Sequence, residues 1–160
     1  MTQSADLTRG DRLRGRSALI TGASRGIGFA IAKSFAMQGA DLVLSASSEA
    51  GLIKAKNELI EYGGEVSYLA ADVSSAKQID DLFAFALESH AELDILVNNA
   101  GMHIAKPFTE HEMDEFGHLM RVNVFSVFQL MQLAIIHMQK LGRGKIINIA
   151  SVAGLRESMN

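Results

Sequence analysis

Three glycines near the N-terminus have the spacing of a phosphate-binding turn. Gly22, Gly26 and Gly28 follow an apolar run, and a helical pattern begins directly after them. A strand that turns into a helix in this way presents unpaired N–H groups and a partial positive charge, which suit a pyrophosphate. Glycine is needed because side chains would block the phosphates or keep the helix away from the strand. The stretch therefore predicts the phosphate cradle of a nicotinamide dinucleotide site.

The context of the glycines supports this interpretation, although such triplets also occur by chance and in ordinary loops. An apolar segment at about 13–20 leads into the turn, and a helical stripe follows it. Gly39 ends that helix, and residues 41–45 supply a second strand, which closes a β-α-β unit. The residues expected on the buried stripe of the helix are Ile27, Ala30, Ile31, Ser34 and Phe35.

The rest of the chain continues to alternate between strand and helix patterns. We expect further strands at about 65–70, 94–97 and 145–150. We expect helices at about 48–62, after an N-cap at Ser75 and at about 110–141. This alternation predicts an α/β fold, a doubly wound parallel sheet of Rossmann type with helices on both faces. The expected order of its five strands is 3-2-1-4-5.

The composition narrows the class of protein. A length of 160 residues suits one domain, and 48% hydrophobic and 21% charged residues are ordinary for a soluble globular protein. The net charge of −3 argues against nucleic acid as the main partner. Four arginines lie between residues 9 and 16, and no apolar signal core follows them. We therefore expect a mobile basic arm at 1–13 and a single nucleotide-binding domain at 14–160.

Metal and thiol chemistry find no support in the sequence. The chain has no cysteine, which excludes disulfides and thiol nucleophiles. His111 and His118 could share a helix face, but neither has a second ligand three or four residues away, so we expect both at a surface or interface. His103 follows Gly101 and is expected to be a plain loop residue, with a substrate contact as the alternative. We expect no metal site.

The predicted helix at 110–141 carries more apolar residues than one stripe can hold, and a second surface must cover the remainder. Either other parts of the chain cover it, or it packs against a second copy. We favour a homodimer or homotetramer through this helix, because nothing left in the chain could cover it. Polar residues interrupt the apolar run, so we expect no membrane span and a cytoplasmic location. They are Asn123, Gln129, Gln132 and His137.

Four separated motifs resemble those of the short-chain dehydrogenases and reductases. They are residues 21–28 (TGASRGIG), residues 98–101 (NNAG), residues 122–124 (VNV) and residues 147–151 (INIAS). The resemblance runs from about residue 14 to the end of the chain. It is close to bacterial members that reduce 3-oxoacyl carriers or oxidise sugar acids and polyols. The resemblance implies an oxidoreductase that moves a hydride between a nicotinamide cofactor and a small-molecule carbonyl or alcohol.

The resemblance assigns cofactor-binding roles to residues on several loops. The glycine turn would hold the pyrophosphate and the adenosine side, and residues 98–101 would lie along the ribose. Asp72, beside Val73, would bond the adenine amino group; the alternative is that Asp72 caps the helix after Ser75. The full set is Gly22, Ser24, Arg25, Gly26, Ile27, Gly28, Ser47, Asp72, Val73, Asn98, Ala100 and Gly101.

Charge near the second strand favours NADP over NAD. An NAD site usually places an acid at the end of this strand to bond the ribose hydroxyls. Here the strand ends in Ser45, Ala46, Ser47 and Ser48, and no acid appears before Glu49. Arg25, on the glycine turn, could bind a 2′-phosphate through a charge-assisted hydrogen bond. We therefore predict NADP as the cofactor, with NAD as the weaker ligand.

Catalytic roles carry over to two residues. Ser151 resembles the serine whose hydroxyl bonds the substrate oxygen, and Asn148, Val152, Ala153 and Gly154 around it support the assignment. Asn123 resembles the asparagine that distorts the long helix and helps to anchor a water molecule of the proton relay.

The family's Tyr-x-x-x-Lys pattern supplies the general acid and base, and it should begin a little over a dozen residues beyond Ser151. The sequence ends at Asn160. General acid–base help is worth about 10²–10⁴-fold, so we expect these residues alone to be nearly inactive. We interpret them as the front portion of a longer enzyme, without the family's C-terminal strands and substrate loop. The alternative is a non-catalytic NADP-binding pseudoenzyme or interaction module.

Overall fold

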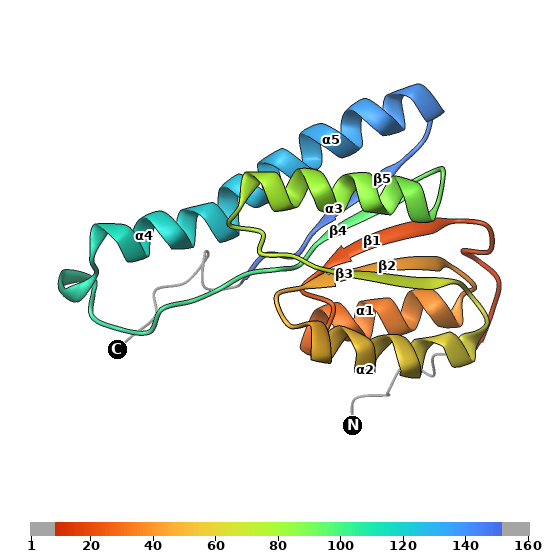
Figure 1. Cartoon of the computed structure of the whole chain (residues 1–160), viewed down its shortest axis with the longest axis horizontal. Helices are drawn as coiled ribbons and strands as arrows, with labels where there is room; N and C mark the ends of the chain where they lie inside the picture. Colours follow the sequence, from red (N-terminus) through yellow and green to blue (C-terminus); the bar gives the residue numbers. More distant parts are fainter. Residues whose placement is uncertain (1–8, 152–160) are drawn as a thin grey trace.

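The computed structural model describes residues 9–151, which form a five-stranded parallel sheet between two layers of helices (Figure 1). The strands lie in the order β3-β2-β1-β4-β5, which confirms the predicted fold and strand order. Their bounds are β1 Ser17–Thr21, β2 Asp41–Ala46, β3 Val66–Ala70, β4 Ile95–Asn98 and β5 Lys145–Asn148. The helices of the two layers are α1 Gly26–Met37, α2 Glu49–Leu59, α3 Ala76–Ser89, α4 Met113–Met120 and α5 Ser126–Leu141.

The central strands carry apolar residues on both sides because both sheet faces are covered. Successive residues of β1 point into opposite layers: Ala18 and Ile20 pack with α1 and α2, whereas Leu19 packs with α3 and α5. β2 divides in the same way, with Leu42 and Leu44 on one side and Val43 on the other. Two apolar cores thus pack against β1 and β2 from opposite sides and fix the positions at which the loops of the site begin.

The buried face of α1 differs from the predicted stripe. Its buried residues are Gly28, Ala32 and Ala36, while Ile27 is 64% exposed and Ala30 is also exposed. The small residues let the helix axis lie close to the sheet, and larger side chains such as Ile31 and Phe35 pack at the margins. The predicted stripe missed this face because glycine and alanine contribute little to a hydrophobic pattern.

The long apolar segment forms a composite helix rather than a regular one. A 3₁₀ turn, η2 (Phe108–Glu110), precedes it, and α4 begins at Met113 with a capping box formed by Glu112 and Glu115. Residues Arg121–Phe125 form a π-helical segment, η3, before α5 begins. The helix therefore starts three residues later than predicted, and its hydrogen-bonding pattern changes around Asn123.

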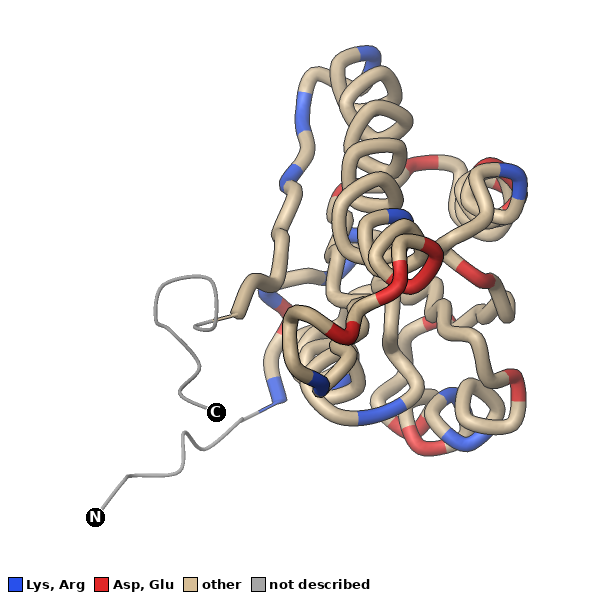
Figure 2. The backbone as a smooth tube through the Cα atoms, turned by 90° about the vertical axis from the view of Figure 1, so that its left-hand side faces the viewer, with Lys and Arg blue, Asp and Glu red and all other residues tan. Residues whose placement is uncertain are grey.

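The composite helix leaves much of its apolar surface uncovered by the described residues. α5 buries Ser126, Leu130, Ala134 and Met138 against the domain. Charged residues are spread over much of the backbone but are sparse on this helix (Figure 2). The segment Met113–Leu141 is long and apolar enough to cross a membrane, with a mean hydropathy of 1.6. Its polar residues therefore do not exclude a membrane span in the way that the sequence led us to expect. One such helix is weak evidence for a membrane protein. The exposed large side chains are Met113, Phe116, Val124, Phe125, Phe128, Ile135 and Ile136.

The basic segment near the N-terminus contacts the domain before residue 14. The backbone N–H groups of Gly10 and Leu13 donate to the carbonyl oxygens of Met37 and Gln38, at 2.9 Å each. The Arg9 guanidinium donates to the Glu61 carbonyl, within the 3₁₀ turn η1 (Ile60–Tyr62). Contacts with the domain thus begin earlier than the boundary predicted at residue 13, and the mobility of the arm stays a prediction.

Candidate functional site

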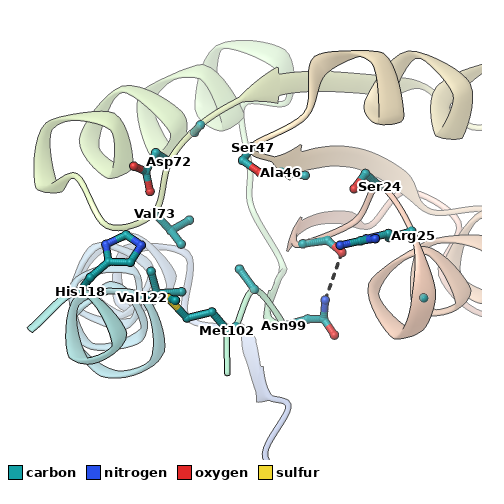
Figure 3. Close-up of a pocket in the computed structure, with 15 residues that line it drawn as sticks. Ser24, Arg25, Ala46, Ser47, Asp72, Val73, Asn99, Met102, His118 and Val122 are labelled. Atoms are coloured by element: carbon teal, nitrogen blue, oxygen red, sulfur yellow. Dashed lines mark hydrogen bonds between the residues drawn. The ribbon is translucent and has the colours of Figure 1, made fainter. Parts of the chain in front are cut away.

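A cavity of about 660 Å³ opens at the carboxyl ends of β1 to β4, where α4 and η3 form one wall (Figure 3). In doubly wound sheets this edge is the usual place for a ligand. Nine of the predicted cofactor residues line it: Gly22, Ser24, Arg25, Gly26, Ser47, Asp72, Val73, Ala100 and Gly101. Ile27, Gly28 and Asn98 do not line it, and their expected contacts with a cofactor stay predictions.

The three glycines of the turn have different physical roles. A Cβ on Gly28 would lie 2.4 Å from the Gly22 carbonyl oxygen, so this glycine permits close packing of helix against turn. Gly22 has a φ of +64°, and a Cβ there would meet Asn99 at 2.8 Å. Gly26 has a φ of +60° and nothing within 4 Å of its Cβ position, so the space above it is open. Only Gly26 leaves room directly for a ligand.

The N-terminus of α1 is open toward the glycine turn. Arg25 occupies the N-cap position in extended conformation, and no side chain caps the helix. Within α1, the first backbone N–H with a partner among the described residues is that of Phe29, which donates to the Arg25 carbonyl. Free N–H groups and the helix dipole together favour an anion at this position. The cradle therefore fits a pyrophosphate.

Thr21 and Asn99 join the glycine turn to the loop after β4, and sequence reasoning gave neither residue a role. The Thr21 hydroxyl accepts from the N–H groups of Asn99 and Ala100, at 3.0 Å each. The Asn99 side-chain amide donates to the carbonyls of Thr21 and Gly22, at 3.0 and 3.2 Å. Asn99 also lines the cavity. The position of Asn99 inside the NNAG motif was the signal available in the sequence.

Arg25 and Ser47 lie at the end of the cavity beside the glycine turn and β2 (Figure 3). Both are exposed, and within residues 9–151 neither side chain forms a hydrogen bond or ion pair. Ser48 is occupied differently, because its hydroxyl caps α2 by accepting from the Gly51 N–H at 3.3 Å. A guanidinium and a hydroxyl thus remain open to an anionic group near the end of β2.

Asp72 forms a local turn and also faces the cavity. Its Oδ1 accepts from the Ser74 N–H at 2.8 Å, and this hydrogen bond lowers the pKa of the carboxyl group. His118 and Arg121 lower it further through their charge. The helix cap itself is Ser75, whose hydroxyl accepts from the Gln78 N–H at 3.4 Å. The capping alternative for Asp72 is therefore wrong, and its carboxylate stays ionised at neutral pH.

Asn123 lies within the π-helical segment and holds the loop after β4. Its side chain donates to the Met102 carbonyl at 2.8 Å and accepts from the Met102 N–H at 2.9 Å. The helix distortion implied by the resemblance is thus present, whereas the role in a proton relay stays a prediction.

Ser151 is the last described residue, and it is exposed outside the cavity lining. Its predicted catalytic contact stays a prediction, and residues 152–154, which supported the assignment, lie outside the described range. Asn98 is 3% exposed, and its side chain donates to Asn148 Oδ1 at 2.8 Å across the β4–β5 pair. This bond fixes the strand ends from which residue 151 follows.

One of the histidines lies at a position that the sequence did not predict. His118, expected only at a surface or interface, lines the cavity on α4. His103 and His111 do not line it. Among residues 9–151 no group of three His, Cys, Asp or Glu side chains could hold a metal ion.

The wider comparison agrees with the geometry. A sequence model described as short chain dehydrogenase matches residues 16–160. The chain belongs to the short-chain dehydrogenase family. Within this family it is 36% identical over 143 residues to D-beta-hydroxybutyrate dehydrogenase of Cupriavidus necator, covering 89% of this chain and 55% of the relative. It is 38% identical over 149 residues to 7alpha-hydroxysteroid dehydrogenase of Escherichia coli K12, covering 93% of this chain and 58% of the relative. The chain thus spans little more than half the length of these relatives.

Solved structures of short-chain dehydrogenases superpose closely on this chain. A 7α-hydroxysteroid dehydrogenase complexed with NADH and 7-oxo glycochenodeoxycholic acid matches with a TM-score of 0.88 and 37% identity, covering 100% of this chain and 61% of that one. A metagenomic short-chain oxidoreductase in complex with NADP matches with a TM-score of 0.87 and 36% identity, covering 91% and 66%. Because these neighbours hold different cofactors, family membership leaves the choice between NAD and NADP open.

Proposed function

We propose that this chain is the cofactor-binding part of an NADP-dependent oxidoreductase that interconverts a carbonyl and an alcohol. The observation that carries the proposal is the open cavity at the carboxyl ends of the strands, with an uncapped helix N-terminus beside it. The α1 N-terminus and Gly26 would hold the pyrophosphate, while Asp72 and Val73 would contact the adenine. When bound, the nicotinamide ring supplies or accepts the hydride, which no amino-acid side chain can do.

We assign the positioning of the substrate to residues that do not line the cavity themselves. We assign the Ser151 hydroxyl a hydrogen bond to the substrate oxygen. Asn123 holds Met102 and thereby the loop that borders the nicotinamide end of the site. The substrate class is a small carbonyl or alcohol, for example a 3-oxoacyl thioester, a sugar acid or a polyol. Full turnover requires a general acid and base in addition to these groups.

The electrostatics at the end of β2 support NADP rather than NAD. Arg25 and Ser47 face the cavity without a protein partner among the described residues, and the first acid after β2 is Glu49. A 2′-phosphate would form a charge-assisted hydrogen bond with the guanidinium, worth about 1.5–3 kcal/mol. An NAD site would instead have an acidic residue at the end of this strand that accepts hydrogen bonds from the ribose hydroxyls.

Replacement of Arg25 by alanine tests the cofactor preference. We expect Arg25→Ala to weaken NADP binding roughly ten- to a hundredfold and to change NAD binding little, because only NADP has the phosphate. Isothermal titration calorimetry with both nucleotides measures the change. Arg14→Ala is the matched control, since Arg14 is exposed and does not line this cavity. Equal affinity of the unmodified chain for NADP and NAD would contradict the preference.

Two further proposals concern the protein's surroundings. We propose that the protein forms a homodimer or homotetramer in which the exposed apolar side chains of the composite helix contact a second copy. The run from residue 122 to 139 contains no Asp, Glu, Lys or Arg, which favours a protein partner over bulk water. We also propose a cytoplasmic enzyme without nucleic-acid or membrane partners, with residues 14–160 acting as one nucleotide-binding unit.

A further inference from the structure

α4 contributes one polar side chain to the cavity, that of His118. His118 is half-buried, and within residues 9–151 its imidazole forms no hydrogen bond with a protein group. Figure 3 shows the ring directed toward Asp72 and Val73, at the end of the cavity away from Ser24 and Arg25. A side chain in this position meets the part of a ligand that lies farthest from the glycine turn.

The surroundings of His118 have the chemistry of a base-binding slot, formed by Asp72, Val73, His118 and Val122. Val73 and Val122 line the same end of the cavity and provide apolar walls. Asp72 lies opposite the imidazole, and its Oδ1 already accepts a hydrogen bond from the Ser74 N–H. An ionised carboxylate can only accept hydrogen bonds, whereas a neutral imidazole donates from one nitrogen and accepts at the other. The slot thus presents an acceptor and a donor to the same ligand edge.

We infer that His118 and Asp72 act as a pair that selects a 6-aminopurine over a 6-oxopurine at this end of the cavity. The inference rests on the proposed nucleotide-binding function and extends it to a residue for which neither the sequence motifs nor the family comparison gave a role. The amino group of adenine donates to the Asp72 carboxylate, and a ring nitrogen beside it accepts from the His118 imidazole. A 6-oxopurine places a carbonyl oxygen against the carboxylate, which repels it, and its protonated ring nitrogen can no longer accept from the imidazole N–H, so this pair of contacts is lost.

Replacement of Arg121 distinguishes two possible roles of His118: a direct contact with the ligand, and an electrostatic effect on Asp72. Arg121 also lowers the pKa of the Asp72 carboxyl group through its charge, but it does not line the cavity. If the role of His118 were only to support the charge of Asp72, loss of Arg121 would have a similar consequence. His111 serves as a second control, because it precedes the same helix and lies outside the cavity lining.

The test compares adenosine 2′,5′-bisphosphate with inosine 2′,5′-bisphosphate, using calorimetry on the full chain. The unmodified chain should bind the adenosine compound at least about tenfold more tightly. His118→Ala should weaken the adenosine compound about fivefold and the inosine compound less than about twofold, as expected for loss of one neutral hydrogen bond. His118→Gln retains an N–H donor and should recover part of the preference. Arg121→Ala and His111→Ala should keep the preference within about twofold.

The outcomes distinguish this inference from the proposed function. If the unmodified chain binds the adenosine compound and His118→Ala retains both affinities and the preference, the inference is overturned while the proposed function stands. If Arg121→Ala reduces the preference as much as His118→Ala, a direct contact from His118 is also overturned. If the folded chain binds neither compound nor NADP, both proposals fail together. Thermal unfolding of each variant verifies that a lost affinity reflects the site and not the fold.

Discussion

At the scale of single residues, the candidate site is built from the glycines of one turn and from polar side chains that join distant segments. Gly22 and Gly26 lie in one turn with positive φ angles, and their spacing in the sequence was sufficient to predict a phosphate-binding turn. The contributions of Thr21 and Asn99 depend on hydrogen bonds between segments 77 to 79 positions apart. The place of His118 on the cavity was not predicted for the same reason, because only the fold brings α4 beside the loop after β3. Local spacing carries no information about such contacts.

The Thr21 hydroxyl leads to a prediction at this scale. Thr21→Val keeps the side-chain shape but removes the acceptor for the N–H groups of Asn99 and Ala100. Thr21 is 2% exposed, and its replacement removes the acceptor of two backbone N–H groups, so the free energy of unfolding should fall by about 2 kcal/mol. Urea denaturation measures the loss. Thr109→Val, at an exposed position, should change the free energy by less than about 0.5 kcal/mol, and equal effects of the two changes would contradict the proposed role.

At the scale of elements, the order and type of the helices and strands followed from hydrophobic periodicity, but two details did not. The face of α1 toward the sheet consists of glycine and alanine, which a hydrophobic pattern does not mark. The π-helical segment at Arg121–Phe125 could not be read from periodicity, and only the resemblance implied a distortion at Asn123. The π-helical segment contributes Val122 to the cavity wall, whereas the small face of α1 lets the helix lie close to the glycine turn.

The exposed side chains of the composite helix give a prediction about assembly. Phe128 and Ile136 are 62% and 56% exposed on α5. If they contact a second copy, Phe128→Glu and Ile136→Glu should lower the molecular mass measured by light scattering to that of the monomer, because burial of a carboxylate is costly. The control is Ile53→Glu, at a 42% exposed position on α2 that should leave the mass unchanged. An unchanged oligomer in both α5 variants would refute an interface through α5.

At the scale of the whole molecule, the two edges of the sheet differ in character. The carboxyl edge carries the cavity, whereas the amino edge is held by an ionic network around Asp94. Arg16 and Arg143 each donate to Asp94 Oδ1 at 2.8 Å, and the Ser17 N–H donates to Oδ2 at 3.2 Å. This network joins the segment before β1 to the turn between α5 and β5. The ionic network and the candidate ligand site thus lie at opposite ends of the strands.

The Asp94 network predicts how stability depends on pH. Burial acts to raise the pKa of Asp94, but hydrogen bonds from Arg143, Ser17 and Arg16 outweigh it and leave the pKa lowered. The stabilisation is therefore fully present above the unfolded pKa of about 3.9 and is lost as the pH falls through the folded value. Asp94→Asn should lower the free energy of unfolding by about 2 kcal/mol at pH 7. Urea titrations from pH 7 to 2 should show the difference shrinking toward acid; a difference that is constant across this range would contradict the account.

The most direct test of the central claim is a calorimetric titration of the folded chain with NADPH and NADH. The account predicts one site per chain, with tighter binding of NADPH. It also predicts that Gly26→Asp abolishes binding, because a carboxylate in the open cradle would repel the pyrophosphate. Aspartate tolerates the left-handed backbone at this position, so the variant should still fold. A folded chain that binds neither nucleotide, or a Gly26→Asp variant that binds NADPH as tightly as the unmodified chain, would contradict the account.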